Sequence, residues 1–131
     1  DSDQQVHLGE NTCAMGLLWI RRSIHFQCTM FRYLLDGREA SFAVKSSYEV
    51  CLKPYHSWAL KKAYLIALSA APGTNESWMA RLGGYDESEH EKAKDEATRR
   101  DLRNLISVWT PLLERWEQIF EELGLEENRR V

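Results

Sequence analysis

The sequence predicts an all-α protein, and three observations support this class. Apolar residues recur at helical spacing along most of the 131 residues, no stretch alternates as a strand would, and glycine or proline stands where the periodic segments end. A chain of this length has room for one domain, so we expect residues 1–131 to be a single unit. The polar residues 1–12 are expected to form a tail or loop.

The first predicted helix runs over about residues 13–35, with Asn11 or Thr12 as its cap and Gly37 as its stop. Its apolar side chains fill two adjoining stripes and leave only a narrow polar sector. A helix of this kind is covered on two sides by other elements, so we expect it to be the central helix of the fold.

A second helix is predicted over about residues 41–53, and Pro54 ends it. We expect the next stretch, residues 53–73, to form one further helix that a Pro-Gly pair closes. Helical spacing gives this stretch an inward face that includes His56, Tyr64 and Leu68. The opposite, outward face carries Trp58, Lys61, Lys62 and Leu65.

The remaining chain predicts a short helical segment around residues 78–82 and then two longer helices. Asp86 and Glu89 have the spacing of a capping box at the start of a highly charged helix, which becomes apolar from Leu102. Thr110-Pro111 is expected to begin the last helix, and Gly124 to stop it.

Composition excludes several classes of function. The net charge of -3, with both signs spread along the chain, argues against nucleic-acid binding. Three cysteines without paired spacing suit a reducing, cytoplasmic location, and no leader or membrane-spanning run is visible, so any membrane contact is expected to be peripheral. The histidines lack metal-site spacing, no nucleophile sits in a catalytic motif, and the carboxylate pairs of "EELGLEEN" and "DESEHE" are typical of a solvated face. We therefore expect neither an enzyme nor a cofactor.

Two tryptophans admit a functional interpretation beside a structural one. Trp19 could be a plain core residue, but Arg22 lies one turn along, where an apolar lining meets a wetter zone, and an indole there could stack on a sugar ring. Trp58 with Lys61 and Lys62 could be an ordinary exposed surface or a contact with anionic lipid. The long apolar faces could be core or could line a cavity for an acyl chain.

With these residues assembled, the chain resembles the glycolipid transfer protein family. The resemblance rests on "GLLWIRR", "SYEVCLKPYHSW" and "ALKKAYLIALSAAP", which follow the order and spacing of the family's motifs. It implies a two-layer all-helical fold that takes up a sphingolipid, holds both hydrocarbon chains inside, and carries the lipid between membranes without a covalent change.

The resemblance also implies roles for individual residues. Trp19 takes the position of the sugar-stacking tryptophan, His56 that of the histidine that binds the ceramide amide region, and Trp58 that of a membrane-contacting tryptophan. The positions that line the family's hydrocarbon tunnel are Phe26, Met30, Leu52, Tyr64 and Leu68. The branch that carries ceramide-1-phosphate places arginines where this chain has Trp19 and Met15, so the resemblance favours a sugar headgroup.

We therefore expect a carrier whose partners are a glycosphingolipid and, transiently, a membrane surface. The resemblance covers about two thirds of a family domain, with the N-terminal helices absent: these lie outside this chain, or the chain is a reduced relative. A carrier or sensor of the ceramide-1-phosphate type and a helical interaction module without lipid are the alternatives.

Overall fold

The computed structural model describes residues 8–9, 12–89 and 91–131, and that part of the chain contains helices, turns and loops but no strand. Two short 3₁₀ turns, Lys53–Tyr55 and Glu87–Glu89, separate some of the longer elements. The α-helices are α1 (Cys13–Leu35), α2 (Ala40–Cys51), α3 (Trp58–Ser69), α4 (Asn75–Gly83) and α5 (Lys92–Glu122). The predicted all-α class is confirmed.

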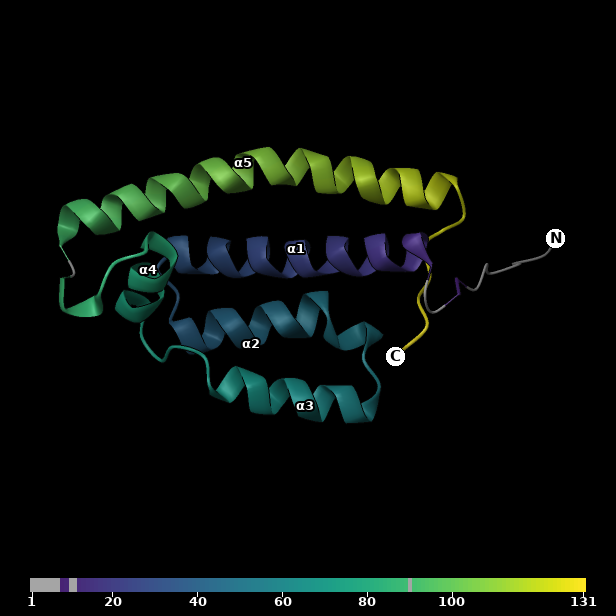
Figure 1. The fold of residues 1–131 in the computed structure, drawn as a ribbon, viewed down its shortest axis with the longest axis horizontal. Helices are drawn as coiled ribbons and strands as arrows, with labels where there is room; N and C mark the ends of the chain where they lie inside the picture. Colours follow the sequence, from purple (N-terminus) through teal and green to yellow (C-terminus); the bar gives the residue numbers. More distant parts are fainter. Residues whose placement is uncertain (1–7, 10–11, 90) are drawn as a thin grey trace.

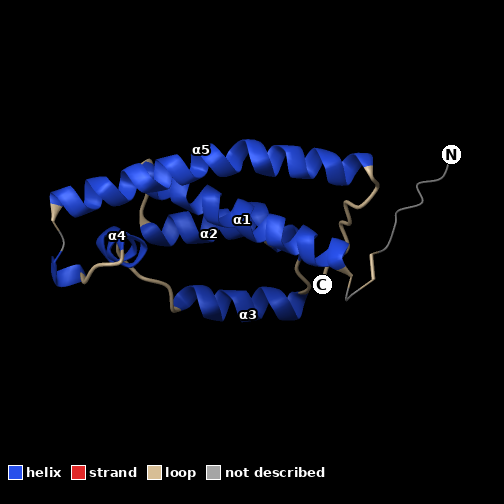
Figure 2. Cartoon of the chain, turned by 45° about the horizontal axis from the view of Figure 1, so that its top comes forward, coloured by secondary structure: helices blue, strands red, loops and turns tan. Residues whose placement is uncertain are grey.

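The helices form two unequal layers. In Figure 1, α5, α1 and α2 lie side by side, and Figure 2 shows α3 running apart below them. α1 packs on both α2 and α5, as expected of a helix that is apolar around most of its circumference. α4 lies at one end, against α5. Within the described part of the chain, α3 is therefore the only helix of the second layer.

α1 has the bounds that its sequence predicts. Its first turn is capped by Thr12, whose hydroxyl accepts the N–H of Met15 at 3.2 Å. At its other end Gly37 has a φ of +79°, a left-handed conformation that costs glycine little, and the chain turns back into α2. The main core joins α1 to three other helices through Met30, Phe31, Leu34, Ala40, Ala43, Val44, Met79 and Leu102.

α5 is one helix, and the prediction of a new helix at Thr110-Pro111 is wrong. Pro111 lies inside it and has no N–H to donate to the preceding turn, which costs about 3 kcal/mol in a helix interior. The helix continues because it is anchored on both sides of the proline, by Leu102 before it and by Leu113 and Phe120 after it. Packing against α1 thus outweighs a strong local breaker.

The loops differ from prediction in two further places. The capping pair at Asp86 closes only the 3₁₀ turn Glu87–Glu89, where the Ser88 N–H donates to the Asp86 carboxylate at 2.9 Å, and α5 begins later, at Lys92. Residues 8–9 lie in a loop as expected, yet Leu8 is buried rather than part of a solvated tail. The rest of the predicted tail, 1–7 and 10–11, lies outside the described residues.

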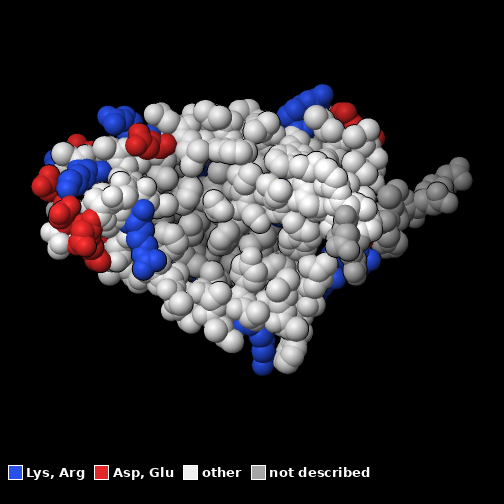
Figure 3. Space-filling model, viewed as in Figure 1, with Lys and Arg blue, Asp and Glu red and all other residues white. Residues whose placement is uncertain are grey.

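The surface is unevenly charged. Charged side chains gather at the end formed by α4 and the start of α5, and they are sparse over the middle of the face in Figure 3. α5 also exposes an apolar stripe at three- and four-residue spacing, which consists of Leu105, Val108 and Leu112. No helix of the described residues is both long and apolar enough to cross a membrane.

Candidate functional site

His56 lies outside any helix. It occupies an extended connection, with φ −99° and ψ 135°, between the 3₁₀ turn Lys53–Tyr55 and α3. The prediction of one helix over residues 53–73 is therefore wrong at its start, because α3 begins only at Trp58. His56 therefore does not lie on the inward helical face that the sequence predicts, and the burial of its side chain has another cause.

That cause is a pair of hydrogen bonds from the far end of the chain. The Ser57 N–H donates to the Val131 carbonyl at 2.5 Å, and the Val131 N–H donates to the Tyr55 carbonyl at 2.9 Å. These bonds satisfy backbone groups on both sides of His56 that a helix would otherwise have paired. The connection is thus held extended by a partner more than seventy residues away in the sequence.

The imidazole of His56 is at the centre of an aromatic cluster that three helices supply. It is 1% exposed, and its Nδ1 lies 3.1 Å from the hydroxyl of Tyr48 on α2. The indole of Trp19, on α1, stacks on it with 5.8 Å between ring centroids and 26° between the planes. The ring centroid of Tyr64, on α3, lies 4.7 Å from that of His56. Burial lowers the pKa of His56, so the ring is neutral near pH 7.

Trp19 forms part of the wall of an open pocket. The pocket has a volume of about 640 Å³ and is lined by Met15, Trp19, Arg129, Arg130 and Val131. The indole is half-buried, so one part packs on His56 while another part faces this space. An aromatic face at the rim of a pocket can stack on the C–H face of a sugar ring.

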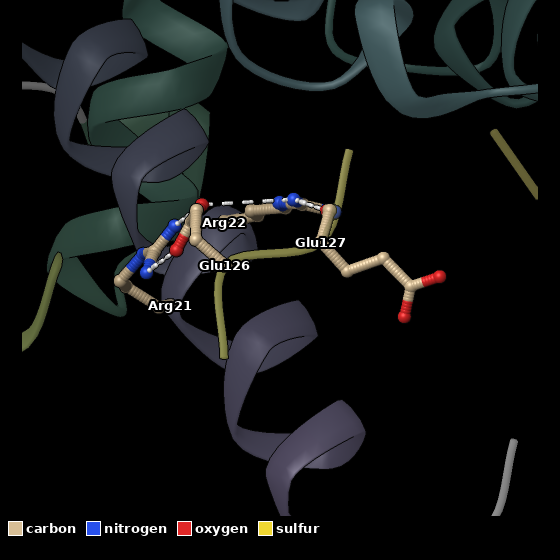
Figure 4. A network of polar contacts seen from close by, with 4 residues as sticks. All are labelled: Arg21, Arg22, Glu126 and Glu127. Carbon is tan, nitrogen blue, oxygen red and sulfur yellow. Dashed lines mark hydrogen bonds and ion pairs between the residues drawn. The ribbon is translucent and has the colours of Figure 1, made fainter. Parts of the chain in front are cut away.

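Arg22 supports the same indole from the protein side. Its guanidinium carbon lies 5.2 Å from the Trp19 ring centroid and 3.6 Å from that of Tyr55. The side chain is 4% exposed, donates to the Glu127 carbonyl and lies 3.7 Å from the Glu126 carboxylate, as Figure 4 shows. Its Nε has no hydrogen-bond partner among the described residues. Desolvation lowers the pKa of this guanidinium.

The residues expected to line a hydrocarbon tunnel meet behind the aromatic cluster. Tyr48, Cys51 and Leu52 form a small buried cluster, against which Phe26, Tyr64 and Leu68 pack. Leu68 also packs on the main core, to which Met30 belongs. Leu68 lines a pocket of about 270 Å³ between α2 and α3 as well. The small cluster and the three side chains packed on it form an apolar seam between the two layers, and Leu68 connects this seam to the main core.

The outer face of α3 is exposed, as its sequence predicts. Trp58 is 72% exposed, and the Lys62 ammonium lies 4.6 Å from its ring centroid. Lys61 and the exposed Leu65 continue the same stripe at helical spacing. Ile66, which is 74% exposed, belongs to this surface too, and its place eight residues after Trp58 could have identified it. No residue of α3 is buried.

Sequence reasoning missed the part played by the 125–131 segment. The prediction that its carboxylates form a solvated face is wrong: Glu127 is 2% exposed, and Glu126 accepts two hydrogen bonds from Arg21 at 2.6 and 2.5 Å (Figure 4). Gly124, with a φ of +68°, ends α5 and turns the chain back toward α1. The apolar Leu125 and Val131 within this charged stretch were the available signal.

The cluster can stack on a ligand and exchange hydrogen bonds with it. In the described part of the chain, no group of three or more His, Cys, Asp or Glu side chains is placed to hold a metal ion. Cys28 and Cys51 are buried, and burial raises the pKa of both thiols, which disfavours the reactive thiolate. The arrangement thus suits binding through rings and polar atoms.

Comparison with known proteins places this chain and its fold in a family. A family profile described as Glycolipid transfer protein matches residues 1–84, more than half of the chain. The chain belongs to the glycolipid transfer protein family. It is similar to Glycolipid transfer protein 2 of Arabidopsis thaliana, at 30% identity over 124 residues. It is also similar to Pleckstrin homology domain-containing family A member 8 of Homo sapiens, at 26% identity over 126 residues.

These family members are longer than the present chain. The match covers 92% of this chain but 52% of the Arabidopsis protein and 23% of the human one. A solved structure described as showing how FAPP2 selects simple glycosphingolipids using the GLTP-fold matches with a TM-score of 0.80 at 26% identity. That match covers 93% of this chain and 58% of the other. The chain thus spans about half the length of the plant relative.

Proposed function

We propose that this chain acts as one domain that binds a glycosphingolipid and carries it between membranes without changing it covalently. The observation that carries the proposal is the stacking of Trp19 on His56 at the rim of an open pocket, directly in front of an apolar seam. A lipid with a sugar head and two hydrocarbon chains has the same division into polar and apolar parts. The solved relative at a TM-score of 0.80 is described as selecting simple glycosphingolipids, which supports this ligand class.

In this proposal Trp19 stacks on the sugar and His56 binds a polar atom at its junction with the ceramide. The His56 Nε2 is the free side of the ring, since Nδ1 lies 3.1 Å from the Tyr48 hydroxyl. Arg22 keeps the indole in place from behind. Burial of the two hydrocarbon chains drives uptake at about 0.8 kcal/mol per methylene. The residues that line their path are Phe26, Met30, Leu52, Tyr64 and Leu68.

The outer face of α3 is the part that meets the membrane. Trp58 suits the depth of the lipid headgroups, Lys61 and Lys62 suit anionic lipid, and Leu65 and Ile66 add apolar area. Contact of this kind is peripheral and transient, and we assign it to cytoplasmic membrane surfaces. No residue of α3 is buried, so little buried side-chain area holds this helix to the first layer. Movement of α3 away from that layer opens a route by which the hydrocarbon chains enter.

A vesicle assay with fluorescent galactosylceramide tests the proposal. Trp19→Ala is expected to reduce transfer about tenfold or more, the effect of losing roughly 1.4 kcal/mol of stacking, while far-ultraviolet circular dichroism stays unchanged. Trp19→Phe keeps an aromatic face and should retain most of the activity. Equal transfer by the Ala variant and the unaltered chain would contradict the role of Trp19, and a chain that transfers no sphingolipid at all would contradict the function.

A helical interaction module without lipid is the second candidate. The exposed stripe Leu105, Val108 and Leu112 on α5 favours it, because such a stripe can pack against another helix. Native mass spectrometry of the purified chain separates the two. A bound species with the mass of a sphingolipid supports the carrier, and a lipid-free dimer supports the module.

A further inference from the structure

The 125–131 segment places two arginines at the Trp19 pocket. Arg129 and Arg130 line this pocket together with Trp19, Met15 and Val131. The backbone that carries them is fixed on both sides. Arg22 donates to the Glu127 carbonyl, and Val131 exchanges two hydrogen bonds with the connection around His56. The backbone of these two arginines is therefore held at the pocket by hydrogen bonds on both sides.

The carboxylates of the same segment are already occupied. Glu126 accepts two hydrogen bonds from Arg21. Glu127 is 2% exposed, accepts the Leu8 N–H at 2.7 Å, and lies 3.2 Å from Arg129. Both acidic groups thus have cationic or N–H partners inside the protein, and neither is free to neutralise a further charge in the pocket.

Arg130 differs from the other arginines of this cluster. It is exposed and forms no ion pair with any carboxylate of the described residues. Arg21 and Arg22 both lie against Glu126, and Arg129 pairs with Glu127, so the charge of Arg130 is not balanced by a carboxylate of the described residues. The pocket therefore carries an excess of positive charge at its solvent side, directly beside a surface suited to a sugar ring.

We infer that the Trp19 pocket takes a sugar headgroup that bears an oxyanion, such as a sulfate or a carboxylate, and that Arg130 binds that group. The inference rests on the proposed glycosphingolipid carrier. A sugar stacked on Trp19 brings a ring substituent toward the pocket wall that Arg130 forms. A guanidinium donates two parallel hydrogen bonds to an oxyanion, which a neutral hydroxyl cannot match in strength. Arg129, already paired with Glu127, contributes charge rather than the principal contact.

Transfer between neutral phosphatidylcholine vesicles tests the inference, since such vesicles remove any attraction of arginines to the membrane itself. The ligands are galactosylceramide, its 3-O-sulfated form and ceramide-1-phosphate. The unaltered chain is expected to transfer the sulfated lipid about tenfold faster than galactosylceramide, a factor that one charge-assisted hydrogen bond can supply. Arg130→Gln should remove this preference, because it reduces transfer of the sulfated lipid far more than transfer of galactosylceramide.

Two matched variants sharpen the test. Arg130→Lys keeps the positive charge but cannot donate two parallel hydrogen bonds, so it should retain part of the preference. Arg115→Gln removes an exposed arginine on α5, outside the pocket, and should change the transfer of neither lipid. The preference should also weaken as salt is raised, because Arg130 is exposed to solvent.

The outcomes separate this inference from the function on which it rests. Galactosylceramide transfer with no preference for the sulfated form, or equal loss of both lipids in Arg130→Gln, overturns the inference and leaves the carrier intact. Rapid transfer of ceramide-1-phosphate also overturns it, since that lipid has no sugar to stack on Trp19. Failure to transfer either glycolipid overturns the carrier and the inference together.

Discussion

The ion pair between Arg21 and Glu126 is expected to contribute measurably to stability, which most surface ion pairs do not. Two hydrogen bonds of 2.6 and 2.5 Å join the groups, and the side chains are only 8% and 18% exposed. The pair fixes the 125–131 segment to α1. A charge-assisted contact in such surroundings is worth roughly 1.5–3 kcal/mol, and we expect a coupling free energy of about 2 kcal/mol.

A double-mutant cycle measures this coupling. The free energy of unfolding in urea is determined for Arg21→Ala, Glu126→Ala, the double variant and the unaltered chain. The control cycle uses Lys92 and Glu96, which are 91% and 65% exposed and 3.8 Å apart, and for which we expect about 0.3 kcal/mol. Coupling in the Arg21 cycle no larger than in the control cycle would refute the conclusion that this pair fastens the segment.

Three further expectations concern other parts of the chain. Because burial lowers the pKa of His56 below its usual 6.5, the unfolded chain binds a proton that the folded chain rejects, so stability is full above this value and falls below it. The free energy of unfolding, measured in urea, should therefore fall less between about pH 7 and pH 5 in His56→Gln than in the unaltered chain. An equal fall in both would exclude His56 as its source. Trp58→Ala should weaken sedimentation with anionic vesicles and change the free energy of unfolding by no more than about 0.5 kcal/mol, whereas unchanged sedimentation would contradict the membrane role of α3. Pro111→Ala should stabilise the chain by about 1–2 kcal/mol, since it restores a helical N–H, and a lower urea midpoint would contradict this expectation.

Local sequence signals were sufficient for part of this fold. α1 has the predicted bounds because its cap, its apolar stripes and Gly37 all act within a few residues of one another. Trp58 points outward as expected because helical spacing holds along α3. Where a structural feature depends on neighbours along the chain, periodicity and caps suffice to predict it.

Three of the errors share another physical origin. Pro111 should have ended a helix, but Leu102 and Phe120 anchor α5 to the rest of the fold on both sides of it. His56 should have been helical, but Val131 pairs with the backbone around it. The 125–131 segment should have been solvated, but α1 supplies its cations. Each error arises from a contact between residues far apart in sequence, which no local pattern can reveal.

In the proposed carrier, the 125–131 segment links stability and ligand selection. Its backbone holds the connection that buries His56, its carboxylates pair with α1, and its arginines line the pocket at Trp19. A change in this segment that alters the headgroup preference through the backbone would therefore also loosen the core. Arg130 is the exception, because its side chain is exposed and unpaired among the described residues. Headgroup preference can consequently change at this one position at little cost in stability, whereas a change at Glu127 or Arg22 cannot be made without disturbing the fold.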